Sequence, residues 1–214
     1  MNSREYMKEV LRYYRSSFDL TQPYSLGGTE YEVLAEFHAS TEKYVLIRKF
    51  KMWSENTDEY VLFSLFEGRA PSLQEVEELQ RALAEDMEPL FVRKGQETLR
   101  DENHMYTYLT MALYCDREPA PEVIRAVKKT RFKKYYQHGL SGYSEGHMYL
   151  YCTESGRCWT NPDGREIKRL FKLVNKNLEK REEQKQKKLP TAPPYQAPSS
   201  APGEKTSADE TATK

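Results

Sequence analysis

The segment from His104 to Cys115 constrains the fold most strongly, because it is apolar on both of its faces. In an extended chain one side of this segment carries Met105, Leu109, Met111, Leu113 and Cys115. The other side carries Tyr106, Tyr108, Ala112 and Tyr114. A strand with two apolar faces needs cover on both, so we expect an inner strand of a sheet packed between helices.

The patterns on either side of this strand predict the remaining elements. Helical spacing of apolar residues indicates helices at 3–17 and 72–92, one that follows Pro119 and Pro121, and one that begins near Arg165. Alternating or β-rich runs indicate strands at 30–39, 43–53, 59–66, 131–137, 147–152 and 158–160. We expect the first three strands to form an antiparallel meander. The order α-β-β-β-α-β-α-β-β-β-α predicts an α+β fold with a mostly antiparallel sheet covered by helices.

Two local signals locate the ends of elements. Ser72 and Glu75 have the spacing of a capping box, and Pro89 should end or kink the helix near its last turn. Gly27–Gly28 follows a helix-breaking proline, so the chain should turn there before the first strand.

A change of composition divides the chain. Large apolar residues nearly vanish after about residue 177, where a charged run is followed by a segment rich in Pro, Ala, Ser and Thr. Such a segment buries too little apolar surface to offset the entropy of ordering. We therefore expect a single α+β domain at 1–178 and a disordered tail at 179–214.

The net charge of zero hides an asymmetry along the chain. Residues 1–102 hold 13 Lys+Arg and 20 Asp+Glu, which gives −7, and residues 103–175 hold 12 and 7, which gives +5. The remaining residues, 176–214, hold 8 and 6, which gives +2. Either the two halves attract each other within one fold, or the basic half offers a surface to an anionic partner.

The charged first residues, the short apolar runs and the number of cysteines indicate the compartment of the protein. The first residues carry charges throughout, unlike a secretory signal, and no run approaches the ~20 apolar residues of a membrane span. Three cysteines fit a reducing compartment better than a disulfide scaffold. We expect a cytoplasmic protein with no membrane contact.

The stretch 122–139 mixes cations with aromatic residues, a combination that binds phosphate and stacks on bases. An ordinary helix end that runs into a half-buried strand explains it better, because the cations then spread over several faces. The candidate residues for binding an anion or a nucleic acid are Arg125, Lys128, Lys129, Arg131, Lys133, Lys134 and Tyr135.

Signals for catalysis or metal binding are weak. The cysteines and histidines lack the spacing of a zinc site, and no nucleophile, phosphate-loop or dinucleotide signature occurs. The opening order of elements resembles that of restriction-endonuclease-like enzymes, with Glu32 and Glu36 as the available carboxylates. The acid-x-Lys pair of those enzymes is missing, so a divergent or inactive nuclease is the alternative to a non-enzymatic role.

Several longer segments resemble a family of uncharacterised domains in clostridial and related Firmicutes proteins. They are FDL at 18–20, GGTEYEVLAEFHASTEKYVLIRK at 27–49, HMYTYLTMAL at 104–113 and KKTRFKKYYQHGLSGY at 128–143. The resemblance implies a shared fold and a bacterial source, and it implies no activity and no site residues.

Together these observations favour a non-enzymatic interaction or accessory module that needs no cofactor. The sequence leaves the partner unknown; the candidates are an anionic ligand such as a nucleic acid, and a protein that the charged tail tethers.

Overall fold

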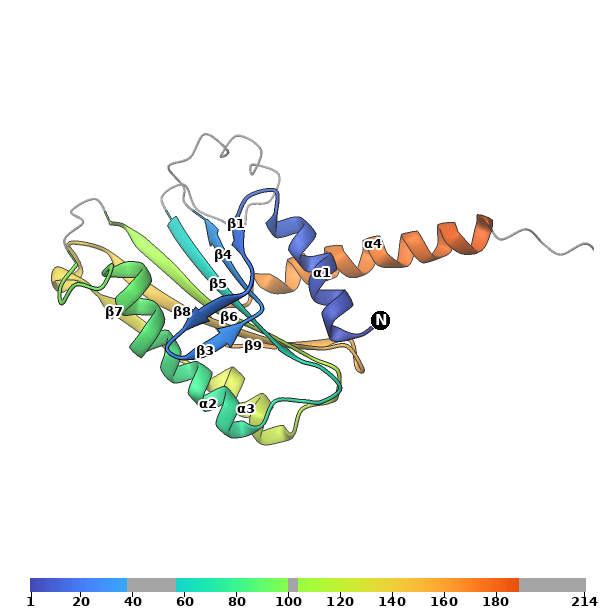
Figure 1. The fold of residues 1–214 in the computed structure, drawn as a ribbon, viewed down its shortest axis with the longest axis horizontal. Coiled ribbons are helices and arrows are strands. Elements are labelled where there is room, and N and C mark those ends of the chain that lie inside the picture. Colours follow the sequence, from blue (N-terminus) through green and yellow to red (C-terminus); the bar gives the residue numbers. More distant parts are fainter. Residues whose placement is uncertain (38–56, 100–103, 189–214) are drawn as a thin grey trace, which may run out of the picture. The chain divides into compact units, whose positions relative to one another are not determined.

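The computed structural model describes residues 1–37, 57–99 and 104–188 (Figure 1). Its helices are α1 (Ser3–Tyr14), α2 (Leu73–Ala82), η2 (Leu83–Val92), α3 (Pro121–Lys129), η3 (Gln137–Gly139) and α4 (Ile167–Lys188). Its strands are β1 (Asp19–Thr21), β2 (Tyr24–Leu26), β3 (Thr29–Tyr31), β4 (Val33–Phe37), β5 (Thr57–Phe66), β6 (Tyr106–Cys115), β7 (Lys133–Tyr135), β8 (Tyr143–Cys152) and β9 (Arg157–Thr160). The expected α+β class is confirmed. The strand expected at 43–53 lies outside the described residues.

A seven-stranded sheet organises the described part of the chain, in the order β1-β4-β5-β6-β8-β7 with β9 also paired to β8. Most of its pairings are antiparallel, as expected, and β6 is an inner strand, as expected. The two longest pairings, β5 with β6 and β6 with β8, are parallel. They are parallel because α2–η2 and α3 carry the chain back to the starting end of the sheet before the next strand begins.

The expected meander is wrong. β4 pairs directly with β5, with Val33 opposite Phe63, so no third strand lies between them. The expected strand 30–39 is also divided, because β3 pairs with β2 in a separate hairpin while β4 joins the main sheet. Gly27 and Gly28 form the turn of that hairpin, and their φ values of 58° and 80° are those of a tight turn that favours glycine.

Helices cover both faces of the sheet and create two differently composed cores (Figure 1). On one face, the α1 residue Tyr6 stacks on Tyr151 with 4.0 Å between ring centroids, and Phe171 of α4 packs edge-on against Tyr149 at 5.3 Å. On the other face, α2, η2 and α3 cover a mainly aliphatic core to which β6 contributes Leu109, Met111, Leu113 and Cys115. The two apolar faces of β6 are thus buried in two different cores.

The second helix begins and ends as expected. The Glu75 backbone N–H donates to Ser72 Oγ at 3.2 Å, and the Ser72 N–H donates to the Glu75 carboxylate at 2.7 Å, which completes the capping box. The helix ends at Val92 with Pro89 in its last turn, but from Leu83 onward it is a π-helix. A π-helix pairs each N–H with the carbonyl five residues back, which relieves the clash that a proline makes with the carbonyl four residues back.

The chain divides into two compact units, residues 1–177 and residues 178–214. Residues 179–188, which the composition assigns to a disordered tail, continue α4 to Lys188. Their Glu, Lys, Gln and Arg are strong helix formers even where little apolar surface is buried. The rest of the expected tail, residues 189–214, lies outside the described residues. No helix in the described part of the chain is long and apolar enough to cross a membrane.

Candidate anion-binding surface

Three of the predicted cations lie together on the exposed face of α3. Pro121 occupies the first turn, and Val123 and Val127 bury the opposite face of the helix. The side chains of Arg125, Lys128 and Lys129 are exposed and make no hydrogen bond or ion pair with any described residue. They are therefore free to meet an anion from solvent.

Arg131 closes the end of this helix. Its guanidinium donates to the Thr130 carbonyl at 2.7 Å and to the Lys128 carbonyl at 3.2 Å. These carbonyls have no helical partner, and a cation is favourable at the negative end of the helix. Both bonds use one terminal nitrogen, so further N–H donors of this exposed guanidinium remain available.

The next strand divides its side chains between the two faces of the sheet, as expected from its alternation. Lys133 donates to Glu145 at 2.8 Å and lies over the Tyr143 ring at 4.1 Å. Hydrogen bonds from His147 and from Lys133 lower the pKa of Glu145 to about 2, although burial opposes this shift. Tyr135, on the same face as Lys133, is 61% exposed.

Lys134 points to the opposite face and binds a buried carboxylate. Glu88 of η2 is 1% exposed and accepts from Lys134 at 3.0 Å, from Arg93 at 3.0 Å and from the Tyr136 hydroxyl at 2.9 Å. Burial raises the pKa of Glu88, but these three donors outweigh it and the pKa is lowered. Lys134 is therefore matched by a carboxylate from the acidic N-terminal half, which makes it a poor ligand for an external anion.

A second row of cations lies on α4, a helix that was predicted from its apolar positions alone. The exposed cations at its start and along its first turns are Arg165, Lys168, Arg169, Lys172 and Lys176. Their spacing of three or four residues places them on one side of the helix, and this spacing was visible in the sequence. Among them, only Arg169 has an ion pair with a described residue, Glu166 at 3.8 Å.

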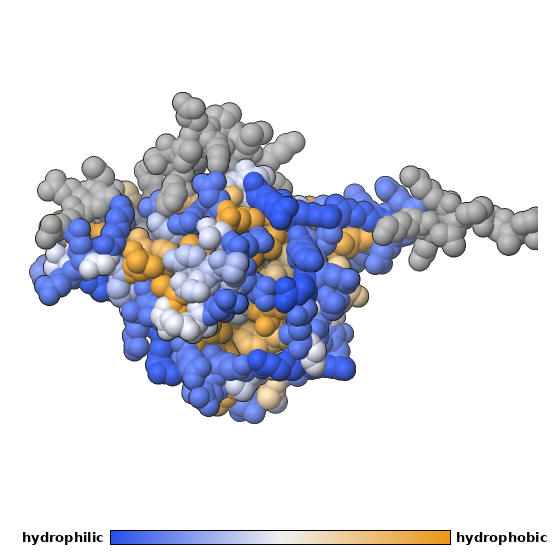
Figure 2. Space-filling view, in the orientation of Figure 1, coloured by the Kyte–Doolittle hydropathy of each residue, from blue (hydrophilic) through white to orange (hydrophobic). Residues whose placement is uncertain are grey.

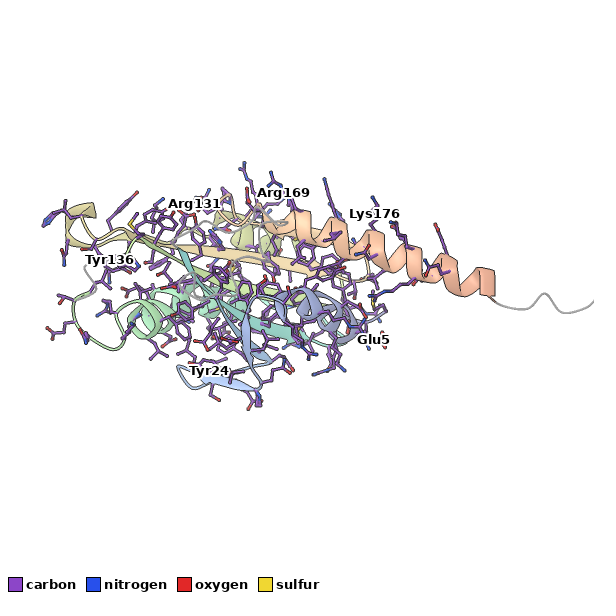
Figure 3. The ribbon with its side chains drawn as sticks, turned by 90° about the horizontal axis from the view of Figure 1, so that it is seen from above. Glu5, Tyr24, Arg131, Tyr136, Arg169 and Lys176 are labelled. Atoms are coloured by element: carbon purple, nitrogen blue, oxygen red, sulfur yellow. The ribbon has the colours of Figure 1, made fainter. Side chains whose placement is uncertain are left out.

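The two rows of cations are linked through a buried asparagine. Asn161, which precedes α4, donates to the Thr130 carbonyl at 3.4 Å and to the Gly146 carbonyl at 2.9 Å, and it accepts from the Met148 N–H at 3.0 Å. Figure 3 shows Arg131, Arg169 and Lys176 along one side of the molecule, with Tyr24 and Glu5 toward the other. We call the exposed cations of these two elements the basic surface; it comprises Arg125, Lys128, Lys129, Arg131, Arg165, Lys168, Arg169, Lys172 and Lys176.

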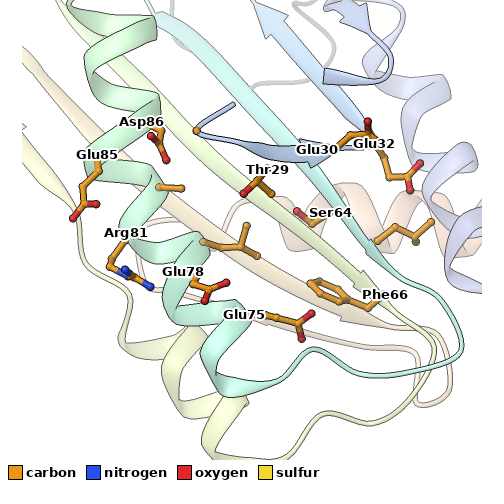
Figure 4. A pocket seen from close by; sticks show the side chains of 14 residues that line it. Thr29, Glu30, Glu32, Ser64, Phe66, Glu75, Glu78, Arg81, Glu85 and Asp86 are labelled. Atoms are coloured by element: carbon orange, nitrogen blue, oxygen red, sulfur yellow. The ribbon is translucent and has the colours of Figure 1, made fainter. Parts of the chain in front are cut away.

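A cavity with the opposite charge lies elsewhere. It has a volume of about 550 Å³, lies between the β2–β3 hairpin and α2, and includes the apolar residues Phe66 and Leu79 (Figure 4). In the view of Figure 2, hydrophobic residues gather below the hairpin with hydrophilic residues around them. The charged residues that line the cavity are Glu30, Glu32, Glu75, Glu78, Arg81, Glu85 and Asp86. The basic residues therefore do not converge on this cavity.

The carboxylates of the nuclease alternative are engaged in other ways. Arg4 donates to both oxygens of Glu32 at 3.0 and 3.1 Å and also binds Glu67. Glu36 lies close enough to Tyr24 and Tyr60 to add to the rise that burial causes in the pKa of both hydroxyls. Within residues 1–37, 57–99 and 104–188, no group of three or more His, Cys, Asp or Glu side chains is arranged to hold a metal ion.

Residues 2–173 match a family described as Domain of unknown function (DUF8052), a match that spans most of the chain. The chain belongs to the DUF8052 family. Comparisons with curated proteins and with solved structures gave no significant match. Membership of an uncharacterised domain family, expected from the sequence, is thus confirmed. The part that matches DUF8052 contains all of the basic surface except Lys176.

Proposed function

We propose that this DUF8052 protein is a non-enzymatic interaction module that binds an anionic polymer across the basic surface. The observation that carries the proposal is the set of exposed cations on α3 and around α4 that pair with no described carboxylate. They are Arg125, Lys128, Lys129, Arg165, Lys168, Lys172 and Lys176. Like charges held close together repel one another, and an anionic polymer relieves that repulsion by replacing many small counterions at once.

A polymer fits this surface better than a small anion does. The cations lie on two elements and extend along α4, whereas the cavity beside the β2–β3 hairpin is lined with carboxylates. A phosphate group taken alone would meet only one or two of the cations. A chain of phosphates can follow them from α3 to α4.

We also infer that the protein works in a bacterial cytoplasm and comes from the Firmicutes. The resemblance of its sequence segments to clostridial domains supports the source. The cysteines Cys115, Cys152 and Cys158 are all free, which supports a reducing compartment.

Binding to inorganic polyphosphate and to DNA, measured at several salt concentrations, tests this proposal. For each polymer we expect the logarithm of the binding constant to fall linearly with the logarithm of salt concentration. The double variant R169Q/K172Q should bind more weakly, with a slope reduced by about 1 for each phosphate contact removed.

The matched control removes the same charge elsewhere. Arg81 lines the acidic cavity and Lys94 follows η2, and both are exposed, so R81Q/K94Q should bind both polymers like the native protein. Equal weakening by the two double variants would indicate a general charge effect and contradict the proposal. Absence of binding to either polymer at low salt would also contradict it.

A further inference from the structure

One face of the sheet carries residues in transverse rows, because the pairing of β7, β8 and β6 aligns them. In the first row, Tyr135 lies opposite Tyr143, and Tyr143 lies opposite Tyr106. In the second row, Lys133 lies opposite Glu145, and Glu145 lies opposite Tyr108. The first row is therefore a run of three tyrosines across three neighbouring strands.

The tyrosine rings of the first row contact one another. The ring centroids of Tyr135 and Tyr143 are 5.9 Å apart, and those of Tyr143 and Tyr106 are 5.6 Å apart with 25° between the ring planes. Tyr106 and Tyr108 continue the contact at 6.1 Å. All three centroid distances lie within the range of about 4.5–7 Å that is typical of aromatic pairs, so the row is a preformed aromatic surface.

The outer end of the row is open at the edge strand β7. Tyr135 is 61% exposed, whereas Tyr143, Tyr106 and Tyr108 are half-buried. Farther along the same face, Tyr6 and Phe171 cover the strands, so the described helices leave the β7 end accessible. An aromatic ring with this exposure at the end of a row can accept another planar ring.

The charges around the tyrosine rows favour binding of an anion beside the rows and not directly over them. Glu145 neutralises Lys133 at 2.8 Å and also contacts His147 at 3.2 Å, so the second row offers little net charge to a phosphate. Arg131 is exposed two positions before Lys133, and Lys128 and Lys129 are exposed just before it on α3. A planar ring on Tyr135 would therefore lie near cations suited to a phosphate backbone.

We propose that the β7 end of the tyrosine row stacks on bases of a single-stranded nucleic acid whose phosphates meet the basic surface. This inference rests on the proposed function and specifies its ligand. Single strands expose the faces of their bases, and stacking on aromatic side chains binds them with little dependence on sequence. A duplex buries those faces within its own stack and offers only base edges in its grooves, and a row of tyrosine rings lacks the hydrogen-bonding pattern that reads those edges.

Substitutions at Tyr135 test this inference, since its exposed side chain can be changed with little risk to folding. Binding is measured by fluorescence anisotropy with three ligands: a labelled single-stranded DNA of about 12 nucleotides, the duplex of the same sequence, and inorganic polyphosphate. A length of about 12 nucleotides is within the range that single-strand-binding domains cover. Y135L should bind the single strand about 5- to 100-fold more weakly, the loss expected when one stacked base is released. Y135F keeps the ring and should bind like the native protein. Neither variant should alter binding to the duplex or to polyphosphate.

The possible outcomes separate this inference from the proposed function. Native affinity of Y135L for the single strand overturns the stacking inference, as does an equal loss for the single strand and polyphosphate. Binding to polyphosphate and duplex without a preference for the single strand overturns stacking and leaves the proposed function standing. Failure to bind all three ligands overturns both.

Discussion

At the scale of single residues, the most informative side chain is Glu88, because a buried carboxylate must be compensated. It lies in the π-helical segment and is held by Arg93, Lys134 and Tyr136. Through the contact with Lys134, one cation of the stretch 122–139 is paired inside the protein. The charge asymmetry along the sequence is explained in part by internal pairing between the acidic and basic halves, and the contact between Glu88 and Lys134 is an example of such pairing.

Replacing Glu88 by Gln should destabilise the protein by about 1 to 3 kcal/mol near neutral pH, since charged donors lose a charged acceptor. The folded pKa of Glu88 is lowered, so its contribution is present above the unfolded pKa of about 4.3 and is lost as pH falls through the folded pKa. The difference in the free energy of unfolding between the native protein and E88Q should therefore shrink as pH falls below about 4. Urea unfolding at several pH values measures this difference.

Glu85 provides the control for that experiment. It lies in the same π-helical segment, is exposed, and has no partner among the described residues. E85Q should leave the free energy of unfolding within about 0.5 kcal/mol of native. Similar losses for E85Q and E88Q would show that the buried network does not stabilise the fold.

At the scale of elements, the periodicity of apolar residues predicted most helices and strands. It did not predict which strands pair with each other. The ends of α2–η2 follow from the capping box and from Pro89, which are local signals. The three-residue strands β1 and β2 carry no usable alternation, and they become strands only because β4 and β3 supply hydrogen-bond partners. The cations on one side of α4 were predictable from their spacing. That Arg169 and Lys176 lie on the same side of the molecule as Arg131 is a matter of tertiary structure, to which the hydrogen bond from Asn161 to the Thr130 carbonyl contributes (Figure 3).

The connection between β7 and β8 offers a test of how tightly the elements pack. Gly142 has a φ of 70°, and a Cβ added there would overlap the Met105 carbonyl oxygen. That carbonyl accepts from the Tyr143 N–H at 3.0 Å, so moving it would also cost a hydrogen bond. Gly156 in the β8–β9 turn has a φ of 64° with open space where its Cβ would lie.

We therefore expect G156A to cost about 1 to 2 kcal/mol of stability, the strain of a left-handed alanine. G142A should cost at least about 1 kcal/mol more, because the backbone of Met105 must also shift. Guanidinium unfolding of both variants gives the difference. Equal costs would mean that the loop after β7 rearranges freely around residue 142.

At the scale of the whole molecule, the three parallel strands at the centre of the sheet determine where the candidate binding residues lie. Crossovers through α2–η2 and α3 make β5, β6 and β8 parallel neighbours. That arrangement aligns Tyr106 with Tyr143 and brings the two halves of the chain together at Glu88 and Lys134. It also leaves the acidic cavity beside the β2–β3 hairpin, apart from the basic surface.

A chain that ends at Asn177 should fold and melt like the full chain. The side chains of Asn175 and Asn177 bond Tyr6 and Tyr13 at 2.7 Å, and both bonds remain within residues 1–177. We expect the midpoint of thermal unfolding to change by less than about 4 °C, which corresponds to about 1 kcal/mol. Polyphosphate binding should also persist. Its loss with the fold intact would instead identify the charged C-terminal residues as the binding element.

Local sequence patterns were enough to predict the α+β class, the inner position of β6, the capping box at Ser72 and the two faces of the strand at 133–135. Each of these depends on neighbours in the chain or on a repeat of two or 3.6 residues, which local physics governs. Tertiary structure alone decided that β4 pairs with β5, that β6 is parallel to both of its neighbours, that Glu88 binds Lys134, and that tyrosines from three strands form one row. Those contacts join residues distant along the chain, and their partners are chosen by the packing of both faces of the sheet at once.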